Sequence, residues 1–422
     1  MPPFTAVGRF RLALVAAALV AALVLPGRAL AARGMEVALE DDTVFVQRIS
    51  YNFDKALGKA LEMRVSRIRA NVLWEVALGR QAHFRKKPKH LKYNWDPWDY
   101  MIDAAAARGI KTQLVITGMA PRWATSDHKI GPMRPNPKLF QEFVTAAAKH
   151  FKGRVDRYSI WNEANHRGWL APLRSQASQY RRLYVRGYNA IKRVDPAAQV
   201  LIGETAPYAS NPRNAQPPLQ FLREVACVDA NYHRVRPCKL YADGYAHHPY
   251  EYHNPPAAKF PGRDNVTMSG LGKLTRALDK LKKARVLRTP GGKALDVYLT
   301  EFGYFARGDQ AISDAKRAKY TVQAYEMALR NPRVHEMLYY LLVRPGSVHD
   351  FFDTSILGRR GQASRPYRKL VSWAAKQAKA GRIATPARHA PPEQPPGGQQ
   401  PPPPPPPPCP VPVPDGVPCP AP

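Results

Sequence analysis

The stretch Val-Asp-Arg-Tyr-Ser-Ile-Trp-Asn-Glu-Ala-Asn-His-Arg-Gly-Trp-Leu occupies residues 155–170. Its first six residues are rich in β-branched and aromatic side chains and predict a short buried strand. The strand is followed by Trp161-Asn162-Glu163-Ala164-Asn165, which places one carboxylate beside two amides. A second apolar run, at 295–300, leads in the same way to Glu301. The sequence therefore predicts two strands that each deliver a glutamate at their carboxyl end.

Outward from these two segments, strand-like and helix-like patterns alternate eight times. Asp96-Pro97 and Asn136-Pro137 each predict a helix start, because an Asx side chain caps the first turn and Pro suits its first position. Eight successive βα units predict an α/β protein with a (β/α)8 TIM barrel. An open doubly wound sheet is the alternative, although no Gly-rich phosphate loop follows the first strand. The eight predicted strands lie at 35–39, 65–74, 110–116, 155–160, 199–203, 241–247, 295–300 and 335–343.

Both ends of the chain differ in composition from its middle. Residues 1–32 have the pattern of a secretory signal peptide, with an apolar run at 12–25 that is shorter than the about 20 residues of a membrane span. An uncleaved N-terminal anchor is the alternative. The segment 386–422 is rich in proline and predicts a disordered, extended tail. The expected organisation is a signal peptide at 1–32, a barrel domain at 33–385 and a tail at 386–422. A secreted, extracellular protein without stable membrane insertion follows from this pattern.

The formal net charge is +32, from 64 Lys and Arg against 32 Asp and Glu. No Arg-rich tail or nucleic-acid motif accompanies this charge, so we expect no nucleic-acid partner. Anionic polymers of the cell surface are the expected partner of an exported basic protein. A generally basic proteome explains the same charge equally well.

Four cysteines form two close pairs, Cys227 with Cys238 and Cys409 with Cys419. In an exported protein, such pairs predict two local disulfides. Zinc binding is the alternative, but neither pair has further Cys or His residues at ligand spacing. His247 and His248 are adjacent on a predicted strand and therefore point to opposite faces, so one metal site for both is disfavoured. We expect no metal and no cofactor.

Polar and aromatic residues end several predicted strands, and a barrel brings strand ends to one mouth. Carboxylates, amide groups and flat aromatic faces together suit a carbohydrate, because its hydroxyls need hydrogen-bond partners and its C–H faces stack on rings. Two carboxylates at one mouth match the pair that glycoside cleavage needs. For Trp123 and Trp169, ordinary packing within the barrel is the alternative role. The candidate residues are Arg69, Trp123, Asn162, Glu163, Trp169, His248, Tyr250 and Glu301.

These motifs resemble those of the retaining glycoside hydrolases of clan A, nearest to families 5 and 39, over residues 35–375. Residues 161–165 resemble the strand-four motif Trp-Asn-Glu-Pro-Asn, with Ala164 in place of Pro. Thr300-Glu301-Phe302-Gly303 resembles the strand-seven motif, and His248 lies in a segment similar to the strand-six His-Pro-Tyr. The eighth strand lacks the Trp that many clan members place beneath the sugar, and Tyr340 is the candidate substitute.

The resemblance implies a double-displacement mechanism with the two carboxyl groups about 5–5.5 Å apart. Glu301 would attack the anomeric carbon, and Glu163 would protonate the leaving oxygen and later deprotonate water. Arg69 and Tyr250 would stabilise the charge of Glu301, and Asn162 would donate to the sugar 2-hydroxyl. Trp123 and Trp169 are the expected stacking surfaces. A non-catalytic glycan-binding barrel and a transglycosylase remain alternatives, and the latter shares every catalytic residue.

Overall fold

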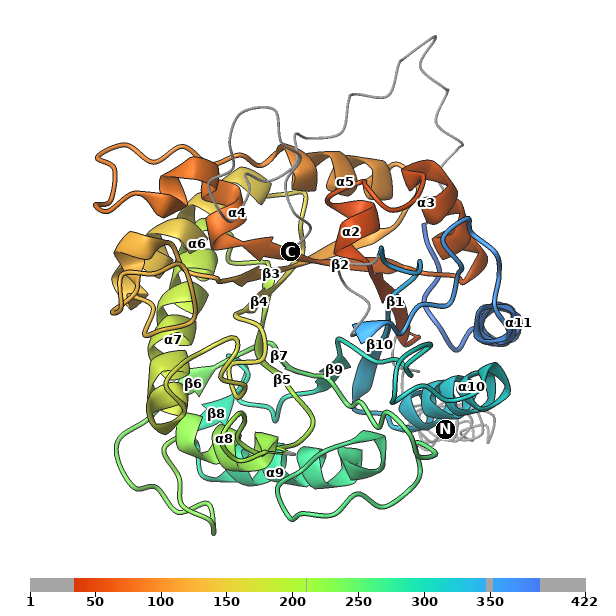
Figure 1. Cartoon of the computed structure of the whole chain (residues 1–422). Helices are drawn as coiled ribbons and strands as arrows, with labels where there is room; N and C mark the ends of the chain where they lie inside the picture. The colour runs from red at the N-terminus through yellow and green to blue at the C-terminus, as the bar shows by residue number, and fades with distance from the viewer. Residues whose placement is uncertain (1–33, 210, 347–351, 388–422) are drawn as a thin grey trace, which may run out of the picture.

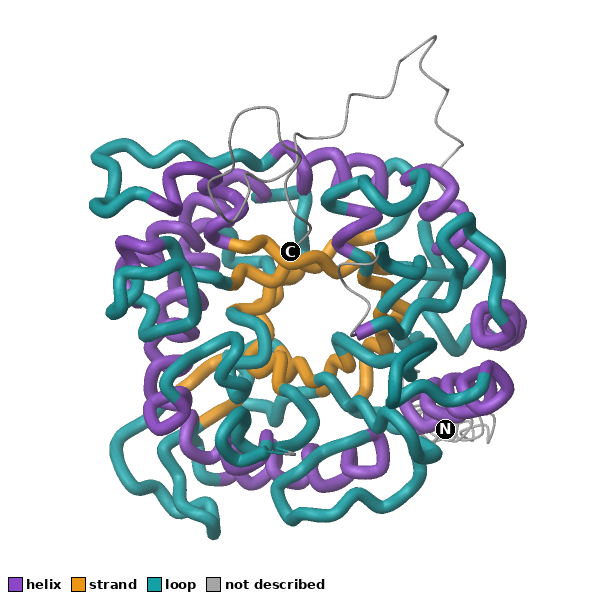
Figure 2. The backbone as a smooth tube through the Cα atoms, in the orientation of Figure 1, coloured by secondary structure: helices purple, strands orange, loops and turns teal. Residues whose placement is uncertain are grey.

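The computed structural model describes residues 34–209, 211–346 and 352–387. Eight parallel strands close into a barrel in the order β1-β10-β9-β7-β5-β4-β3-β2. They form a ring that helices surround, and long loops connect the two layers (Figures 1 and 2). The predicted (β/α)8 fold is confirmed. The strands are β1 (Glu36–Glu40), β2 (Arg67–Leu73), β3 (Lys111–Thr117), β4 (Arg157–Ile160), β5 (Gln199–Thr205), β7 (Gly244–His247), β9 (Val297–Leu299) and β10 (Val334–Tyr340).

Most helices begin where the sequence supplies a side-chain cap or a proline. The Asn136 side chain accepts hydrogen bonds from the backbone N–H groups of Lys138 and Leu139, and Pro137 follows it, as predicted. At the other predicted start, Asp96 is the first helical residue and caps nothing, because Trp95 occupies the cap position. The helices are α2 (Asp42–Phe45), α3 (Phe53–Glu62), α4 (Trp74–Leu78), α5 (Asp96–Ala106), α6 (Pro137–Phe151), α7 (Gln176–Val194), α8 (Pro218–Val225), α9 (Leu271–Lys283), α10 (Asp314–Arg330) and α11 (Arg365–Lys379). Of these, α4, α7 and α9 have neither a side-chain cap nor a proline at their start.

The predicted sixth strand is shorter in the structure. It begins at Gly244, whereas Leu240–Tyr241 forms a separate strand, β6. That strand pairs with β8 (Leu287–Arg288) in a two-stranded sheet of its own. Tyr241 therefore pairs outside the barrel, although the sequence predicted it in the sixth barrel strand.

The barrel contains a buried network of polar side chains. Arg67, Arg69 and Asn71 alternate with Ile68 and Ala70 along β2. Side chains two residues apart share one face of a strand. The two arginines bind carboxylates of other barrel strands, Arg67 that of Glu36 and Arg69 those of Glu40 and Glu204. The alternation therefore sends the polar side chains of β2 into the barrel.

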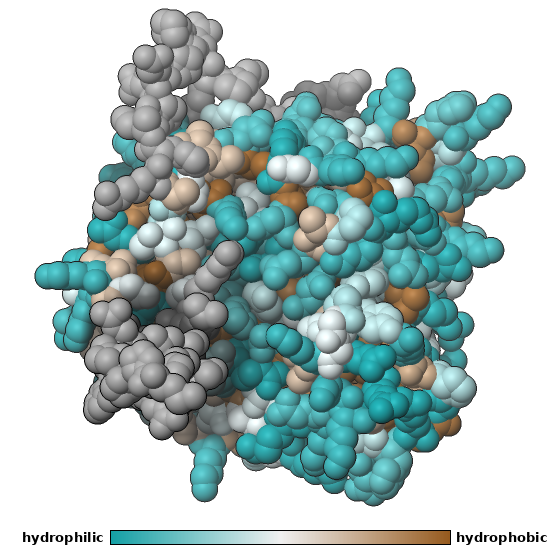
Figure 3. Space-filling view, turned by 180° about the vertical axis from the view of Figure 1, so that it is seen from behind, coloured by the Kyte–Doolittle hydropathy of each residue, from teal (hydrophilic) through white to brown (hydrophobic). Residues whose placement is uncertain are grey.

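The surface seen from behind is mostly hydrophilic, and its hydrophobic residues are scattered (Figure 3). Within the described ranges, no helix has both the length and the apolar character that crossing a membrane requires. The predicted signal peptide, Cys409, Cys419 and all but the first two residues of the predicted tail lie outside the described residues.

Candidate active site

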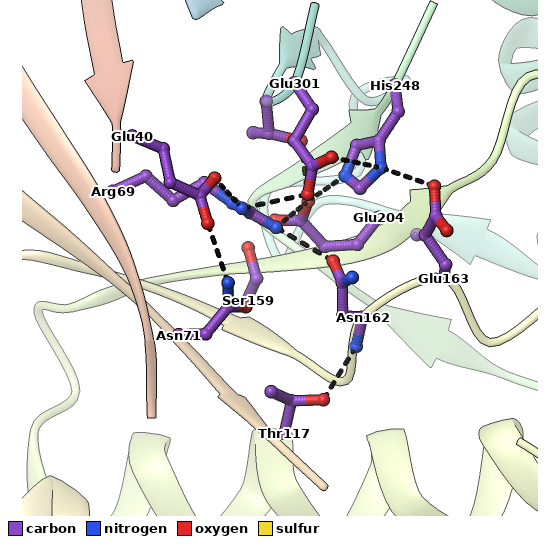
Figure 4. A network of polar contacts seen from close by, with 12 residues as sticks. Glu40, Arg69, Asn71, Thr117, Ser159, Asn162, Glu163, Glu204, His248 and Glu301 are labelled. Carbon is purple, nitrogen blue, oxygen red and sulfur yellow. Dashed lines mark hydrogen bonds and ion pairs between the residues drawn. The ribbon is translucent and has the colours of Figure 1, made fainter. Parts of the chain in front are cut away.

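Glu163 and Glu301 meet at the carboxyl ends of the strands. Glu163 follows β4, and Glu301 follows β9. The two carboxylates lie on either side of the His248 ring (Figure 4). One oxygen of Glu163 lies within 4.8 Å of one oxygen of Glu301. The side chain of Glu163 is 20% exposed and that of Glu301 is 11% exposed. The first glutamate is thus the more accessible one, and the second is held deeper.

His248 joins the two glutamates. Its Nδ1 lies 3.0 Å from Glu163 Oε1 and 3.5 Å from Glu301 Oε2. Its Nε2 lies 2.8 Å from Glu204 Oε2. Burial opposes a charge on this ring, but Glu301 and the two hydrogen-bonded glutamates raise the pKa of His248 to about 10. An imidazolium therefore stands between the two candidate catalytic carboxylates at neutral pH.

Arg69 is the second cation of the site. Its guanidinium donates to Asn162 Oδ1 at 2.9 Å and lies 3.1 Å from oxygens of Glu204 and Glu301. It also pairs with Glu40. Burial raises the pKa of Glu301, and His248 and Arg69 counteract this effect. Arg69 thus places a positive charge beside the deeper glutamate. The role that the family resemblance implies for it, stabilising the charge of Glu301, stays a prediction.

The Asn162 amide lies beside the two glutamates. Its Oδ1 is taken by Arg69, and its backbone N–H donates to Thr117 Oγ1 at 3.1 Å. Among the described residues, its Nδ2 has no hydrogen-bond partner. This fixed amide therefore keeps two N–H donors for a ligand beside the carboxylates.

A third buried glutamate, Glu204 at the end of β5, was not among the predicted site residues. Its Oε2 accepts hydrogen bonds from Arg69 at 3.1 Å and from Thr300 Oγ1 at 2.6 Å, and it pairs with His248. Although burial opposes ionisation, Arg69 and then His248 lower the pKa of Glu204 to about 2. The carboxylate therefore fixes both cations of the site.

The backbone around these glutamates is held in an unusual conformation. Trp161, Glu163 and Glu204 have φ values of 66°, 36° and 45°, in the left-handed region that non-Gly residues rarely adopt. The Glu163 N–H donates to the carbonyl of Glu204 at 2.8 Å. A Cβ at Gly118 would lie 2.6 Å from the Trp161 ring, so only glycine leaves room for this indole. Backbone strain of this kind gathers at functional sites.

The predicted tyrosines lie at the site. The Tyr250 hydroxyl donates to Glu301 Oε2 at 3.1 Å. Burial, followed by the charges of Glu301 and Glu40, raises the pKa of Tyr340. Tyr340 ends β10. Its replacement of the missing tryptophan beneath a sugar stays a prediction.

The two tryptophans predicted to stack on a sugar contact residues other than the site glutamates. The Trp123 indole N–H donates to the carbonyl of Gln81 at 3.0 Å, and its ring packs edge-on against Trp74. The Trp169 carbonyl accepts from Trp161 Nε1 at 2.9 Å. Both side chains are half-buried. Their role as sugar-stacking surfaces stays a prediction.

Glu163, His248 and Glu301 each offer one ligand atom, and these atoms lie within 4.8 Å of one another. This spacing would suit a cation. Both ring nitrogens of His248 also contact carboxylates. The three side chains therefore already form one network of hydrogen bonds and ion pairs.

Cys227 and Cys238 are free thiols in the structure, so the predicted disulfide is not formed there. Their sulfurs lie 3.9 and 3.8 Å from the same carbonyl oxygen, that of Val225. Burial and the neighbouring Cys227 thiol raise the pKa of Cys238 to about 12. The two thiols are thus neighbours, and a bridge between them under oxidising conditions stays a prediction.

No family model and no curated protein matches this sequence. A family 39 glycoside hydrolase from Bacteroides cellulosilyticus WH2 matches the structure with a TM-score of 0.60 and 18% identity, over 81% of this chain and 64% of that one. This chain spans less than two thirds of its length. A family 39 β-xylosidase from Caulobacter crescentus matches with a TM-score of 0.55 and 17% identity, over 82% and 72%. A family 39 enzyme from Xanthomonas axonopodis pv. citri gives 0.54 and 16%, over 82% and 67%. At these identities the likeness establishes the fold: this chain has the barrel architecture of structures described as family 39 glycoside hydrolases.

Proposed function

We propose that this protein is a retaining glycoside hydrolase that cleaves O-glycosidic bonds of a poly- or oligosaccharide. The observation that carries the proposal is the approach of the Glu163 and Glu301 oxygens to within 4.8 Å at the carboxyl end of the barrel. Retaining enzymes hold their two carboxyl groups about 5–5.5 Å apart, whereas inverting enzymes leave about 6.5–9.5 Å for a water molecule. The observed spacing supports direct attack by one carboxylate.

Each side chain has a role in this mechanism. Glu301, ionised and held by Arg69 and Tyr250, attacks the anomeric carbon and forms a glycosyl-enzyme ester. Glu163, the more accessible carboxyl group, gives its proton to the leaving oxygen. It then takes a proton from the water that attacks the ester and releases the sugar. The Nδ2 group of Asn162 donates to the sugar 2-hydroxyl, a contact that strengthens in the transition state.

The setting of the enzyme is part of the proposal. The signal-like segment at 1–32 supports secretion, and the net charge of +32 supports contact with anionic polymers at the cell surface. A transglycosylase is the second candidate, because it would use the same two glutamates with a sugar in place of water as the acceptor. Assays would begin with aryl β-glycosides, including xylosides because one structural neighbour is described as a β-xylosidase.

Azide rescue tests the roles of the two glutamates. Glu301→Ala should abolish cleavage of an aryl glycoside, and azide should restore it with an inverted product, because the anion attacks from the vacated side. Glu163→Ala should still cleave a dinitrophenyl glycoside in its first step, because that leaving group needs no proton. Its second step should slow, and azide should give a product of retained configuration.

Wild-type hydrolysis followed by NMR provides the control. A product that retains its configuration is expected. Inversion by the wild type would contradict the mechanism, and the opposite azide pattern would exchange the roles of the two residues. If neither the panel of aryl glycosides nor polysaccharides are cleaved or transglycosylated, the protein is a glycan-binding barrel instead.

A further inference from the structure

The outer face of the barrel along α6 and α7 carries two adjoining hollows. The two helices pack side by side (Figure 1). The hollows have volumes of about 570 and 560 Å³, and both are lined by Gln141 and Arg186. We call the two together the α6–α7 groove. Its remaining lining residues are Lys138, Glu142, Thr145, Ala146 and Lys149 in one hollow and Arg181, Arg182, Val185, Asn189 and Arg193 in the other.

The charge of the α6–α7 groove is strongly one-sided. Six lining residues are Lys or Arg, and one, Glu142, is acidic. That carboxylate already pairs with Lys87, and α7 itself contains no acidic residue. Within the described ranges, Lys138, Lys149, Arg182 and Arg193 pair with no carboxylate. The groove therefore holds an excess of positive charge that the protein itself does not neutralise.

The cations form a row along α7. Arg182, Arg186, Asn189 and Arg193 follow the spacing i, i+4, i+7 and i+11, which places them on one face of a helix over about 16 Å. Arg186 is held by a 2.7 Å hydrogen bond to Gln141 Oε1. Neighbouring like charges on a helix repel one another. An anionic ligand along the row would remove this repulsion.

We propose that the α6–α7 groove binds a chain of an anionic polysaccharide. Arginine forks bind carboxylate and sulfate groups in two-point contacts. The amide groups of Gln141 and Asn189 and the Thr145 hydroxyl stand among the cations and match sugar hydroxyls. The residues that line the two hollows thus offer charged and hydrogen-bonding contacts rather than ring stacking.

This inference deepens the partner part of the proposed function by naming the surface, and it requires no cleavage chemistry. The groove belongs to the outer helices, and the glutamates belong to the strand ends. Binding through the groove would hold the enzyme on a polymer while the barrel mouth stays open. Loss of glycosidase activity and loss of polymer binding are thus separate observations.

The test uses sodium polygalacturonate as the probe and the full mature chain as the protein. The groove variant combines Lys149→Gln, Arg182→Gln and Arg193→Gln, which removes three exposed charges. The matched control combines Lys282→Gln, Lys283→Gln and Lys293→Gln, which removes three exposed charges around another surface hollow, beside α9. Affinity is measured by calorimetry at two salt concentrations, with single-stranded DNA and neutral dextran as comparison ligands. Circular dichroism verifies that each variant is folded.

We expect the wild type to bind polygalacturonate less tightly at higher salt. The groove variant should bind it at least about tenfold more weakly and with a smaller salt effect, while the control changes less than about twofold. Equal losses in both variants would show a general effect of net charge and overturn the proposal. Absence of wild-type binding would overturn it as well. Tighter binding of DNA than of the glycan, lost only in the groove variant, would replace the proposed ligand by nucleic acid.

Discussion

Two cations face four carboxyl groups at the mouth of the barrel. Burial holds the pKa of Glu40 well above its usual range, and Arg69 counteracts this effect. Two positive charges therefore face up to four negative ones. The proposed acid catalysis requires Glu163 in its protonated form. The cations are Arg69 and His248, and the carboxyl groups are those of Glu40, Glu163, Glu204 and Glu301.

Glu204→Gln tests whether this balance depends on the third glutamate. The pKa of His248 should fall from about 10, because one of its stabilising carboxylates is gone. An ordinary imidazole titrates near 6.5. The stability that the imidazolium contributes is fully present below that pH and is lost as pH rises through about 10. The imidazolium also counteracts the burial that raises the pKa of the proposed nucleophile, Glu301, so loss of its charge should lower activity. We therefore expect the alkaline limb of the pH–rate profile to move to lower pH, with kcat reduced by about 100-fold and KM changed little.

Glu336→Gln is the control for this effect. Glu336 is also a fully buried glutamate, but it lies on β10 and accepts a hydrogen bond from Arg157 at 2.5 Å. Its replacement should change the unfolding temperature at most. If both variants move the alkaline limb alike, Glu204 has no specific role in positioning His248.

The sequence points to Glu163 and Glu301, the proposed catalytic pair, but not to Glu204, which contacts both cations of the site. Glu163 and Glu301 stand in motifs with polar or aromatic neighbours, so local pattern identifies them. Glu204 stands between Gly203 and Thr205 without such a motif. Its two cationic partners lie 135 and 44 residues away in the chain. Only the closure of the barrel reveals this contact.

At the scale of single elements, β2 connects the two ends of the barrel. Its inward arginines serve different networks: Arg69 reaches the glutamates at the mouth, and Arg67 binds Glu36 and Asp156 at the opposite strand ends. The eight barrel strands could be predicted because apolar runs recur at regular intervals along the sequence. The sheet of β6 and β8 could not, since two-residue strands carry no periodic signal.

The network around Arg67 should make stability depend on acidity. Burial opposes ionisation of Glu36, but Arg157 and Arg67 lower its pKa to about 2. A carboxylate with a lowered pKa stabilises the fold above its unfolded value, about 4.3, and loses this contribution as pH falls towards 2. The free energy of unfolding, measured with urea, should therefore decrease between pH 5 and pH 3.

Arg67→Met should weaken both the fold and this pH dependence. Removing one partner of a buried ion pair costs about 3–5 kcal/mol at neutral pH. Lys111→Met is the matched control, because Lys111 is 62% exposed and contacts the same Asp156 at 3.2 Å. An exposed pair contributes about 1 kcal/mol or less. An unchanged pH slope in Arg67→Met would show that the arginine does not set the pKa of Glu36.

At the scale of the whole molecule, the two ends of the described domain meet beside β1. Met35 donates its N–H to the carbonyl of Arg382, and Ala384 donates to the carbonyl of Met35, both at 3.1 Å. Ile383 between them is buried. The Ala387 N–H donates to the carbonyl of Gly109, also at 3.1 Å. Among the described residues, backbone contacts thus extend to Ala387. The domain boundary at 385 stays a prediction.

Two truncations test where the folded unit ends. A chain that stops after Ala387 keeps every contact described for the domain, and the removed proline-rich composition cannot build a core. We expect its turnover to stay within about twofold of that of the full chain.

A chain that stops after Gly381 loses both hydrogen bonds to Met35 and the buried Ile383 side chain. Its free energy of unfolding in urea should fall by about 3 kcal/mol, from the lost apolar burial and the unpaired backbone groups. Equal stability of both truncated chains would show that the contact between the chain ends does not support the barrel. A large loss of turnover in the longer chain, if that chain is folded, would show that the tail takes part in the reaction.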